Sequence, residues 1–162
     1  MFMNSYEYHV VILEARDNGK LSEQLYKSVV QTLQINRIGH SRITLPSVLE
    51  LPVAFRIAIE ATKGTEIKDT NTWQRPDGYI FLGSFLKNEM ACNSLIYTET
   101  LRSLQDLACY YTLPISYGMV VADCIDENSN YGELGHSAAL SCINLIDLKQ
   151  KFGLEPSSIL AP

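Results

Sequence analysis

Short apolar runs alternate with segments of helical periodicity along the chain. Tyr8 to Leu13 is an almost continuous apolar run, which is typical of a strand covered on both faces. Apolar residues then recur every four positions and define one face of a helix, at Leu21, Leu25, Val29 and Leu33. The segment Arg42 to Leu45 predicts a second, shorter strand.

The rest of the chain repeats this alternation. Ser47 to Glu50 reads Ser-x-x-Glu, a capping box that predicts the start of a helix, and Pro52 is tolerated in its first turn. Tyr79 to Leu82 and Pro114 to Val121 predict the third and fourth strands, whereas residues 62–76 are polar, lack a period and predict a surface loop. Three further helices are predicted by apolar residues at helical spacing: Leu51, Ala54, Phe55 and Ala58; Tyr97, Leu101, Leu104, Ala108 and Tyr111; Ala139, Leu140, Ile143 and Ile146.

Strands that alternate with helices predict βαβ units with right-handed crossovers and therefore a parallel sheet. We expect an α/β fold, a three-layer helix–sheet–helix sandwich around a four-stranded parallel sheet. A chain of 162 residues fits one ordinary domain, so we expect a single domain over residues 1–162.

Composition and charge narrow the class of protein. Hydrophobic residues make up 46% and charged residues 19%, which is a globular composition. A formal net charge of -5 without clustered Lys and Arg argues against nucleic acid as a partner. Neither a secretory signal nor a membrane-spanning run is expected. The four cysteines form no CxxC pair, so we expect reduced thiols, no metal site and a cytoplasmic location.

A ligand site is expected at one edge of the predicted sheet. Ligands of open parallel sheets bind outside the carboxyl ends of the strands, which are followed here by residues 15–18, 46–50, 83–89 and 121–124. The first three of these loops lead into helices, whose free N–H groups could hold an anion. The chain has no GxGxxG, no GxxxxGK[ST] and no GxSxG motif, so the usual nucleotide sites and the hydrolase elbow are not predicted.

These four segments, taken together, resemble one enzyme family. Ala15-Arg16-Asp17-Asn18 resembles ARFN, and Pro46 to Pro52 (PSVLELP) resembles PGAFELP. Gly83 to Glu89 (GSFLKNE) resembles GAVIRGE, and Pro114 to Gly118 (PISYG) followed by Ala122-Asp123 resembles PISFG and ADT. Their order and spacing are those of 6,7-dimethyl-8-ribityllumazine synthase, and the resemblance covers about residues 8–148. It implies a flavodoxin-like fold.

The resemblance implies a transferase of riboflavin biosynthesis. The family condenses 5-amino-6-(ribitylamino)uracil with 3,4-dihydroxy-2-butanone 4-phosphate to 6,7-dimethyl-8-ribityllumazine, without a metal or organic cofactor. It implies a homo-oligomer, a pentamer or a multiple of pentamers, in which neighbouring subunits share each site. Such an enzyme works mainly by holding two reactive partners in register.

The resemblance also implies roles for individual residues. Glu50 falls on the carboxylate that binds the ribityl chain, a role that is compatible with capping a helix. Tyr117 falls on an aromatic residue that packs on the substrate of the adjacent subunit. The complete substrate-binding set comprises a first-loop residue, the capping-box segment, residues that meet the pyrimidine and the phosphate, and this tyrosine: Asp17, Val48, Leu49, Glu50, Ser84, Phe85, Leu86, Glu89, Met90 and Tyr117.

Several positions depart from the family pattern. Cys92 stands at the position of the catalytic histidine, and a thiol with the ordinary pKa of about 8.5 is a poor proton shuttle at neutral pH. Asp17 replaces the phenylalanine that stacks on the uracil, and the basic residue that holds the phosphate has no counterpart in the shortened segment after Asp123. His136 could supply a donor there, or it could be an ordinary residue at the start of a helix.

Three hypotheses remain open from the sequence. The first is a divergent lumazine synthase that is active but slow. The second is a non-catalytic homologue that binds lumazine or flavin or serves only as an assembly protein. The third is an unrelated flavodoxin-like domain with another ligand.

Overall fold

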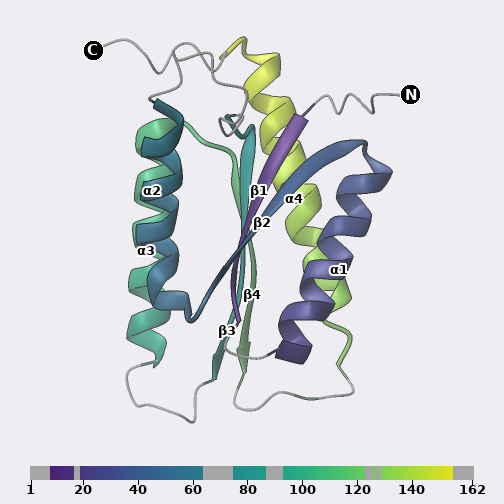
Figure 1. Ribbon diagram of the computed structural model, residues 1–162, viewed down its shortest axis with the longest axis vertical. Coiled ribbons are helices and arrows are strands. Elements are labelled where there is room, and N and C mark those ends of the chain that lie inside the picture. The colour runs from purple at the N-terminus through teal and green to yellow at the C-terminus, as the bar shows by residue number, and fades with distance from the viewer. Residues whose placement is uncertain are drawn as a thin grey trace.

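The computed structural model describes residues 8–16, 19–63, 75–86, 93–122, 126 and 129–154. Its four strands form one sheet in the order β2-β1-β3-β4 (Figure 1). They are β1 (Tyr8–Ala15), β2 (Ile38–Leu45), β3 (Gly78–Leu86) and β4 (Ile115–Ala122). All three pairings are parallel, which confirms the predicted sheet. The strand order reverses at β1, the topological switch point where α/β folds place their ligands.

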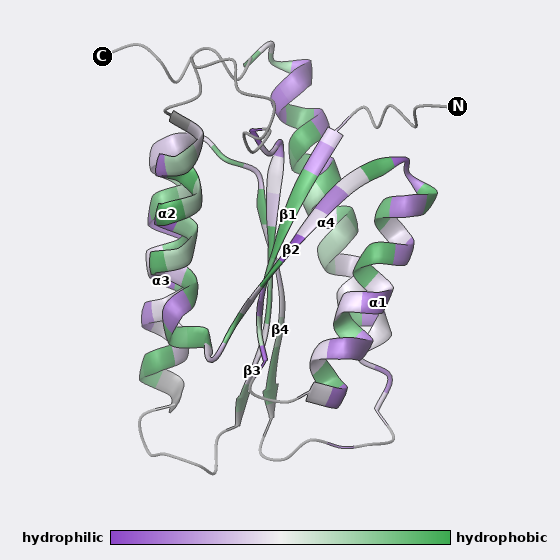
Figure 2. Ribbon diagram, viewed as in Figure 1, coloured by the Kyte–Doolittle hydropathy of each residue, from purple (hydrophilic) through white to green (hydrophobic). Residues whose placement is uncertain are grey.

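Two helices cover each face of the sheet, as expected for a three-layer sandwich (Figure 1). α1 (Gly19–Ile35) and α4 (Gly132–Lys151) pack on one face, and α2 (Leu51–Lys63) and α3 (Asn93–Tyr111) on the other. Val10 to Leu13 of β1 are completely buried because both faces of this central strand are covered. In Figure 2, hydrophobic residues dominate the part of β1 that lies between the helix layers.

Each face of the sheet has its own core. Under α2 and α3, the ring of Phe55 meets those of Tyr79 and Phe81 edge to face, with centroids 4.8 and 5.0 Å apart. Under α1 and α4, aliphatic side chains such as Leu25 and Ile80 fill the space. Among the residues that the structure describes, no helix combines the length and the apolarity that crossing a membrane requires.

Most strand ends lie within two residues of the prediction, and three element boundaries have further consequences. β2 begins at Ile38 and not at Arg42, because this edge strand carries half-buried polar residues that an apolar pattern does not reveal. β3 continues to Leu86, so residues 83–86 are strand and not loop. α2 runs to Lys63, past the predicted start of the loop at residue 62, and residues 64–74 lie outside the described residues.

Candidate functional site

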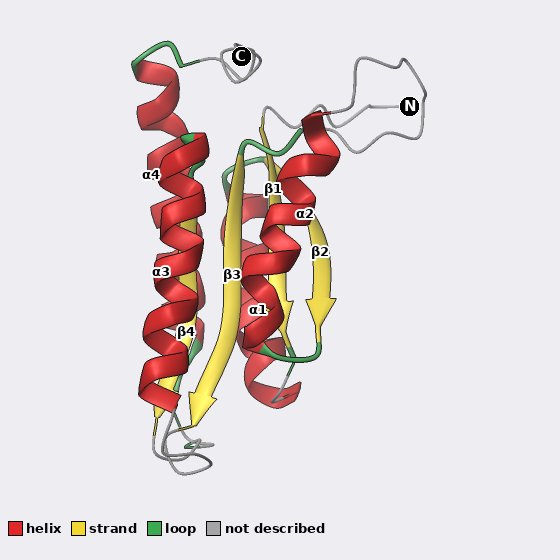
Figure 3. Ribbon diagram, turned by 90° about the vertical axis from the view of Figure 1, so that its left-hand side faces the viewer, coloured by secondary structure: helices red, strands yellow, loops and turns green. Residues whose placement is uncertain are grey.

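The carboxyl ends of the strands meet at one edge of the molecule, where the arrowheads in Figure 3 point. Ala15 at the end of β1 is level with Leu45 at the end of β2. The pairing of β1 with β3 ends at Glu14 and Leu82, whereas β3 continues to Leu86 beside β4. The edge of the sheet is therefore stepped, and the last residues of β3 project beyond the end of β1.

Gly83 lets three of the expected binding segments meet at this step. A Cβ atom on Gly83 would lie 2.8 Å from Val48 Cγ1, 3.3 Å from Ala15 Cβ and 3.3 Å from Met119 Sδ. The first distance is too short for a real contact, so a side chain at this position would force the segments apart. The end of β1, the capping-box segment and the extension of β3 thus lie together.

The capping box is present and fixes Glu50. Ser47 and the one-turn 3₁₀ helix Val48–Glu50 lead directly into α2. Ser47 Oγ accepts a hydrogen bond from the Leu49 N–H at 3.2 Å, while Glu50 Oε2 accepts from Ser47 N at 2.9 Å and from Ser47 Oγ at 2.7 Å. The Ser47 hydroxyl, followed by backbone N–H donors, lowers the pKa of the exposed Glu50 carboxyl. Glu50 is therefore an ionised carboxylate in a fixed position.

The side chains next to Glu50 and Gly83 differ in burial. Val48 is buried against β3, and Leu49 is exposed beside it. Ser84 and Phe85 are both buried in the extension of β3, and the Phe85 ring packs edge to face on Tyr97 of α3 at 5.0 Å. Since the Phe85 side chain belongs to the core, only its backbone can face a ligand at the step.

Several of the predicted site residues cannot be placed. The backbone of Leu86 ends β3, but its side chain is not described. Asp17, Glu89, Met90 and Cys92 lie outside the described residues. Their roles stay predictions of the family resemblance.

Tyr117 lies on the strand beside the step, but its side chain is held within the chain. It is paired with Phe81, and the two rings stack with centroids 5.9 Å apart. Its hydroxyl donates to Gln105 Oε1 of α3 at 3.0 Å, and burial raises its pKa. Met119, two residues further along β4, lies 3.3 Å from the position of a Cβ on Gly83, so β4 borders the step while the Tyr117 ring packs against the core under α2 and α3.

All three histidines of the chain are described, and each is held by a partner away from the step. His9 Nε2 and Ser41 Oγ are 2.8 Å apart at the amino-terminal ends of β1 and β2. His40 lies 3.4 Å from the Tyr26 hydroxyl, and burial lowers the pKa of both His9 and His40. His136 lies within α4, with Nδ1 2.9 Å from Thr32 Oγ1 in the second half of α1. His136 is thus an ordinary helix residue, and the geometry offers no histidine that replaces the family's proton shuttle.

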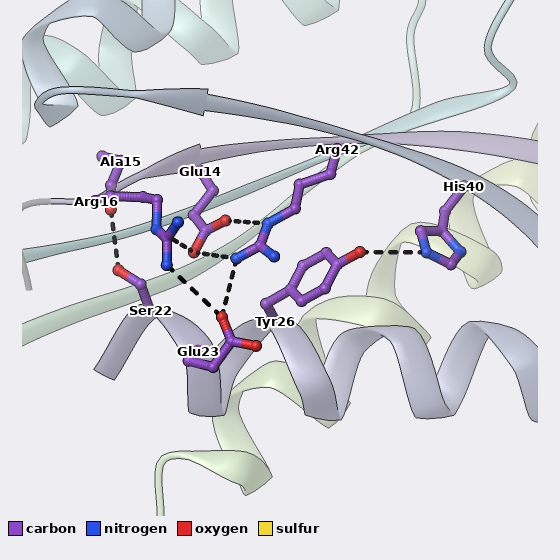
Figure 4. A network of polar contacts seen from close by, with 8 residues as sticks. All are labelled: Glu14, Ala15, Arg16, Ser22, Glu23, Tyr26, His40 and Arg42. Carbon is purple, nitrogen blue, oxygen red and sulfur yellow. Dashed lines mark hydrogen bonds and ion pairs between the residues drawn. The ribbon is translucent and has the colours of Figure 1, made fainter. Parts of the chain in front are cut away.

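The sequence reasoning missed a buried ionic network at the end of β1 (Figure 4). Glu14 is completely buried, and Arg42 contacts both of its oxygens, with Nε 2.6 Å from Oε2 and Nη2 3.1 Å from Oε1. Hydrogen bonds to Glu14 are the main cause that raises the pKa of Arg42. One feature of the sequence indicates this network: Glu14 follows an apolar run directly. Because a charge on a buried strand must be paired, a cationic partner for Glu14 could have been predicted.

Comparison with known proteins agrees with the motifs. The sequence model of the family described as 6,7-dimethyl-8-ribityllumazine synthase matches residues 7–150. A protein of that name from Bartonella tribocorum is 30% identical over 153 residues, covering 90% of this chain and 92% of its own. Another from Agrobacterium fabrum is 27% identical over 152 residues, covering 90% and 97%.

Among solved structures, an NAD(P)H:quinone oxidoreductase from Methanothermobacter marburgensis covers 88% of this chain and 97% of its own, at 12% identity and a TM-score of 0.43. That likeness is too weak to bear on function. The family match covers all four strands and all four helices, so the hypothesis of an unrelated domain is wrong. The chain belongs to the 6,7-dimethyl-8-ribityllumazine synthase family.

Proposed function

We propose that the protein is a lumazine synthase, which condenses 5-amino-6-(ribitylamino)uracil with 3,4-dihydroxy-2-butanone 4-phosphate to 6,7-dimethyl-8-ribityllumazine. The observation that supports this most is the packing of Val48 and Ala15 around Gly83, with an ionised, hydrogen-bonded Glu50 in the same segment. The family's ribityl-binding motif and its pyrimidine-binding motif therefore share one edge of the sheet.

In this proposal Glu50 binds the ribityl chain. A carboxylate accepts hydrogen bonds from sugar hydroxyls, and charge-assisted bonds of this kind are stronger than neutral ones. Ser47 already holds one Glu50 oxygen in place, so little side-chain freedom is lost when the substrate binds. The backbone of Phe85 and Leu86, beyond the last pairing of β3 with β1, offers peptide groups to the pyrimidine.

Catalysis then comes mainly from holding the two reactants together. Fixing two partners in register can supply about 7–11 kcal/mol, whereas general acid–base help is worth roughly 10²–10⁴-fold in rate. Cys92 stands at the family's histidine position, and the three histidines of the chain are engaged elsewhere. We therefore propose a slow enzyme, in which water carries the protons that a histidine carries in the family.

The same reasoning supports a homo-oligomer with shared sites, built from one domain of each chain over residues 1–162. The resemblance has Tyr117 pack on the substrate of the adjacent subunit, and β4, which carries it, is an outer strand of the sheet that a second chain can approach. Exposed apolar side chains on α2 and α3 support a subunit contact there: Val53, Ile57, Leu95 and Tyr110. Pentamers or multiples of pentamers are what we propose, in the cytoplasm, where Cys109 and Cys142 would stay free thiols.

The test is to mix the purified protein with both substrates and follow lumazine absorbance against a protein-free reaction. Acceleration above that background supports the enzyme, and Glu50→Gln should raise the KM for the ribityl-aminouracil. Absence of acceleration rejects catalysis. Light scattering of the same sample reports the assembly, and a stable monomer contradicts shared sites.

A second candidate is a non-catalytic homologue that binds lumazine or flavin, or that serves only as an assembly protein. The placement of all three histidines away from the step favours it. Titration of riboflavin with the protein separates these cases, because binding changes flavin fluorescence. An inactive protein that quenches flavin is a binder, and one that leaves the signal unchanged while assembling has only the structural role.

A further inference from the structure

Arg42 holds the buried Glu14 carboxylate with two nitrogens of its guanidinium. The Nε–Oε2 and Nη2–Oε1 distances of 2.6 and 3.1 Å describe a two-point contact, which fixes the relative orientation of the side chains as well as neutralising the charge. Tyr26 of α1 packs on the guanidinium, whose carbon lies 3.6 Å from the ring centroid (Figure 4). Arg42 is thus held on two sides.

The same guanidinium joins three elements. Glu14 belongs to β1, Arg42 to β2, and Arg42 Nη2 also donates to Glu23 Oε2 of α1 at 3.2 Å. These contacts lie directly before and after the connection from β1 to α1. Arg42 therefore links the end of β1 to the first turns of α1.

Backbone contacts extend this arrangement to the step at the carboxyl edge. The Arg16 N–H donates to the Leu45 carbonyl at 2.9 Å, and Ser22 Oγ donates to the Ala15 carbonyl at 3.2 Å. Leu45 is followed directly by Pro46 and the capping-box segment. The ends of β1 and β2 and the first turn of α1 are thus connected around Arg42.

Arg16 competes for the same carboxylates but holds them weakly. Its Nε lies 3.9 Å from Glu14 Oε1 and its Nη2 lies 3.7 Å from Glu23 Oε2. Its side chain is 45% exposed, against 25% for Arg42. If Arg42 were lost, Arg16 would be the nearest cation in the network and would have to turn inward, and this would pull on the connection from β1 to α1.

We propose that Arg42 is a positioning residue for the candidate site, which joins Glu14 to Glu23 and thereby holds the end of β1 beside the end of β2, from which the capping-box segment begins. The inference rests on the proposed function, because the family resemblance assigns Glu50 of that segment to the ribityl chain. Nothing in the family motifs singles out Arg42, which lies before the segment Pro46 to Pro52.

The test compares Arg42→Lys and Arg42→Met with the wild type and with Arg102→Met. Lysine keeps a positive charge near Glu14 but cannot make the two-point contact. Arg102 is a matched control, because it also pairs with two carboxylates, those of Glu99 and Asp106, but all three lie on the exposed side of α3. In both Arg42 variants we expect the KM for the ribityl-aminouracil to rise about tenfold while kcat changes by less than about twofold, with no change in Arg102→Met.

Hydrogen exchange supplies a readout that does not depend on activity. We expect the amides of Ala15, Arg16 and residues 19–23 to exchange faster in Arg42→Lys than in the wild type and in Arg102→Met, with the core of β3 unchanged. If Arg42→Met does not fold, Arg42→Lys carries the test. If neither folds, the double variant Glu14→Leu with Arg42→Leu takes their place, since it removes both charges and keeps the site filled.

The outcomes separate this inference from the proposed function. An active wild type whose KM is unchanged by the Arg42 variants, or a change confined to kcat, overturns the positioning role and leaves the enzyme standing. An inactive wild type that binds neither substrate overturns the proposed function. In that case faster exchange at Ala15, Arg16 and residues 19–23 still supports the positioning role, and unchanged exchange overturns it.

Discussion

Gly83→Ala is expected to destabilise the protein and to disturb the candidate site together. The new methyl carbon would lie 2.8 Å from Val48 Cγ1, about 0.7 Å inside the closest comfortable separation of two carbons. Val48 cannot swing away easily, because it is buried and because a β-branched side chain has few allowed rotamers. Overpacking of this kind lowers the free energy of unfolding by about 1–3 kcal/mol.

The clash predicts a specific compensation. Val48→Ala removes both γ carbons and by itself should lower the free energy of unfolding by about 1–2 kcal/mol, through lost burial and a small cavity. In the double variant the methyl on residue 83 occupies part of that space. We expect the double variant to be no less stable than Val48→Ala, so that the two substitutions are far from additive.

Urea unfolding followed by circular dichroism measures these differences, at one protein concentration because oligomers gain stability with concentration. Gly19→Ala is the matched control, since a Cβ there meets nothing within 4 Å. It should be neutral or slightly stabilising at the start of α1. In the enzyme assay, Gly83→Ala should raise the KM for the ribityl-aminouracil, because the displaced segment carries Glu50, and Val48→Ala should restore it in the double variant.

Two results would refute this reasoning. One is a Gly83→Ala variant within about 0.5 kcal/mol of the wild type, the range of an ordinary surface substitution. The other is an additive double variant, with a coupling energy below about 0.5 kcal/mol. Either result would mean that β3 and the capping-box segment are not in the contact described here.

Three further predictions concern pH, packing and proton transfer. Burial keeps the pKa of His9 and His40 below the ordinary value of about 6.5, so as the pH falls the unfolded chain takes up protons before the folded chain does. The stability that the neutral histidines contribute is therefore complete above pH 6.5 and declines as the pH falls below it. In urea unfolding, His9→Gln and His40→Gln should reduce this decline. Asp77 acts in the opposite direction, because burial raises its pKa. Tyr117→Phe should lose only the 3.0 Å hydrogen bond to α3, about 0.5–1.5 kcal/mol by denaturation, and keep its activity because the ring remains. Cys92→His should raise kcat by up to about 10²-fold without a matching change in KM in the lumazine assay, and an unchanged kcat would show that this position does not transfer protons.

The apolar pattern predicted the central elements better than the edges. β1 is buried on both faces and carries an unbroken apolar run, so its existence and its place in the sheet followed from sequence. β2 is an outer strand with polar residues in its middle, and its half-buried His40 and Arg42 are satisfied by partners on α1 and β1. Since those partners are distant in sequence, the start of β2 could not be predicted from local composition.

The candidate site shows the same division. The Ser47–Glu50 capping box is local, and the sequence predicted its hydrogen bonds correctly. The extension of β3 to Leu86 depends on β4, which pairs with it as far as Ala122. A strand that gains its hydrogen bonds from a distant segment gives no local signal for where it ends.

The sequence by itself determined the alternation of strands and helices, the parallel sheet, the family and the capped carboxylate, because each rests on periodicity, on short-range hydrogen bonds or on ordered motifs. Only the tertiary structure decided that Gly83 brings three segments together, that Tyr117 packs on Phe81 and bonds to Gln105, and that Arg42 neutralises Glu14. These are contacts between residues far apart in the chain. Their geometry depends on how the layers pack, which no single stretch of sequence encodes.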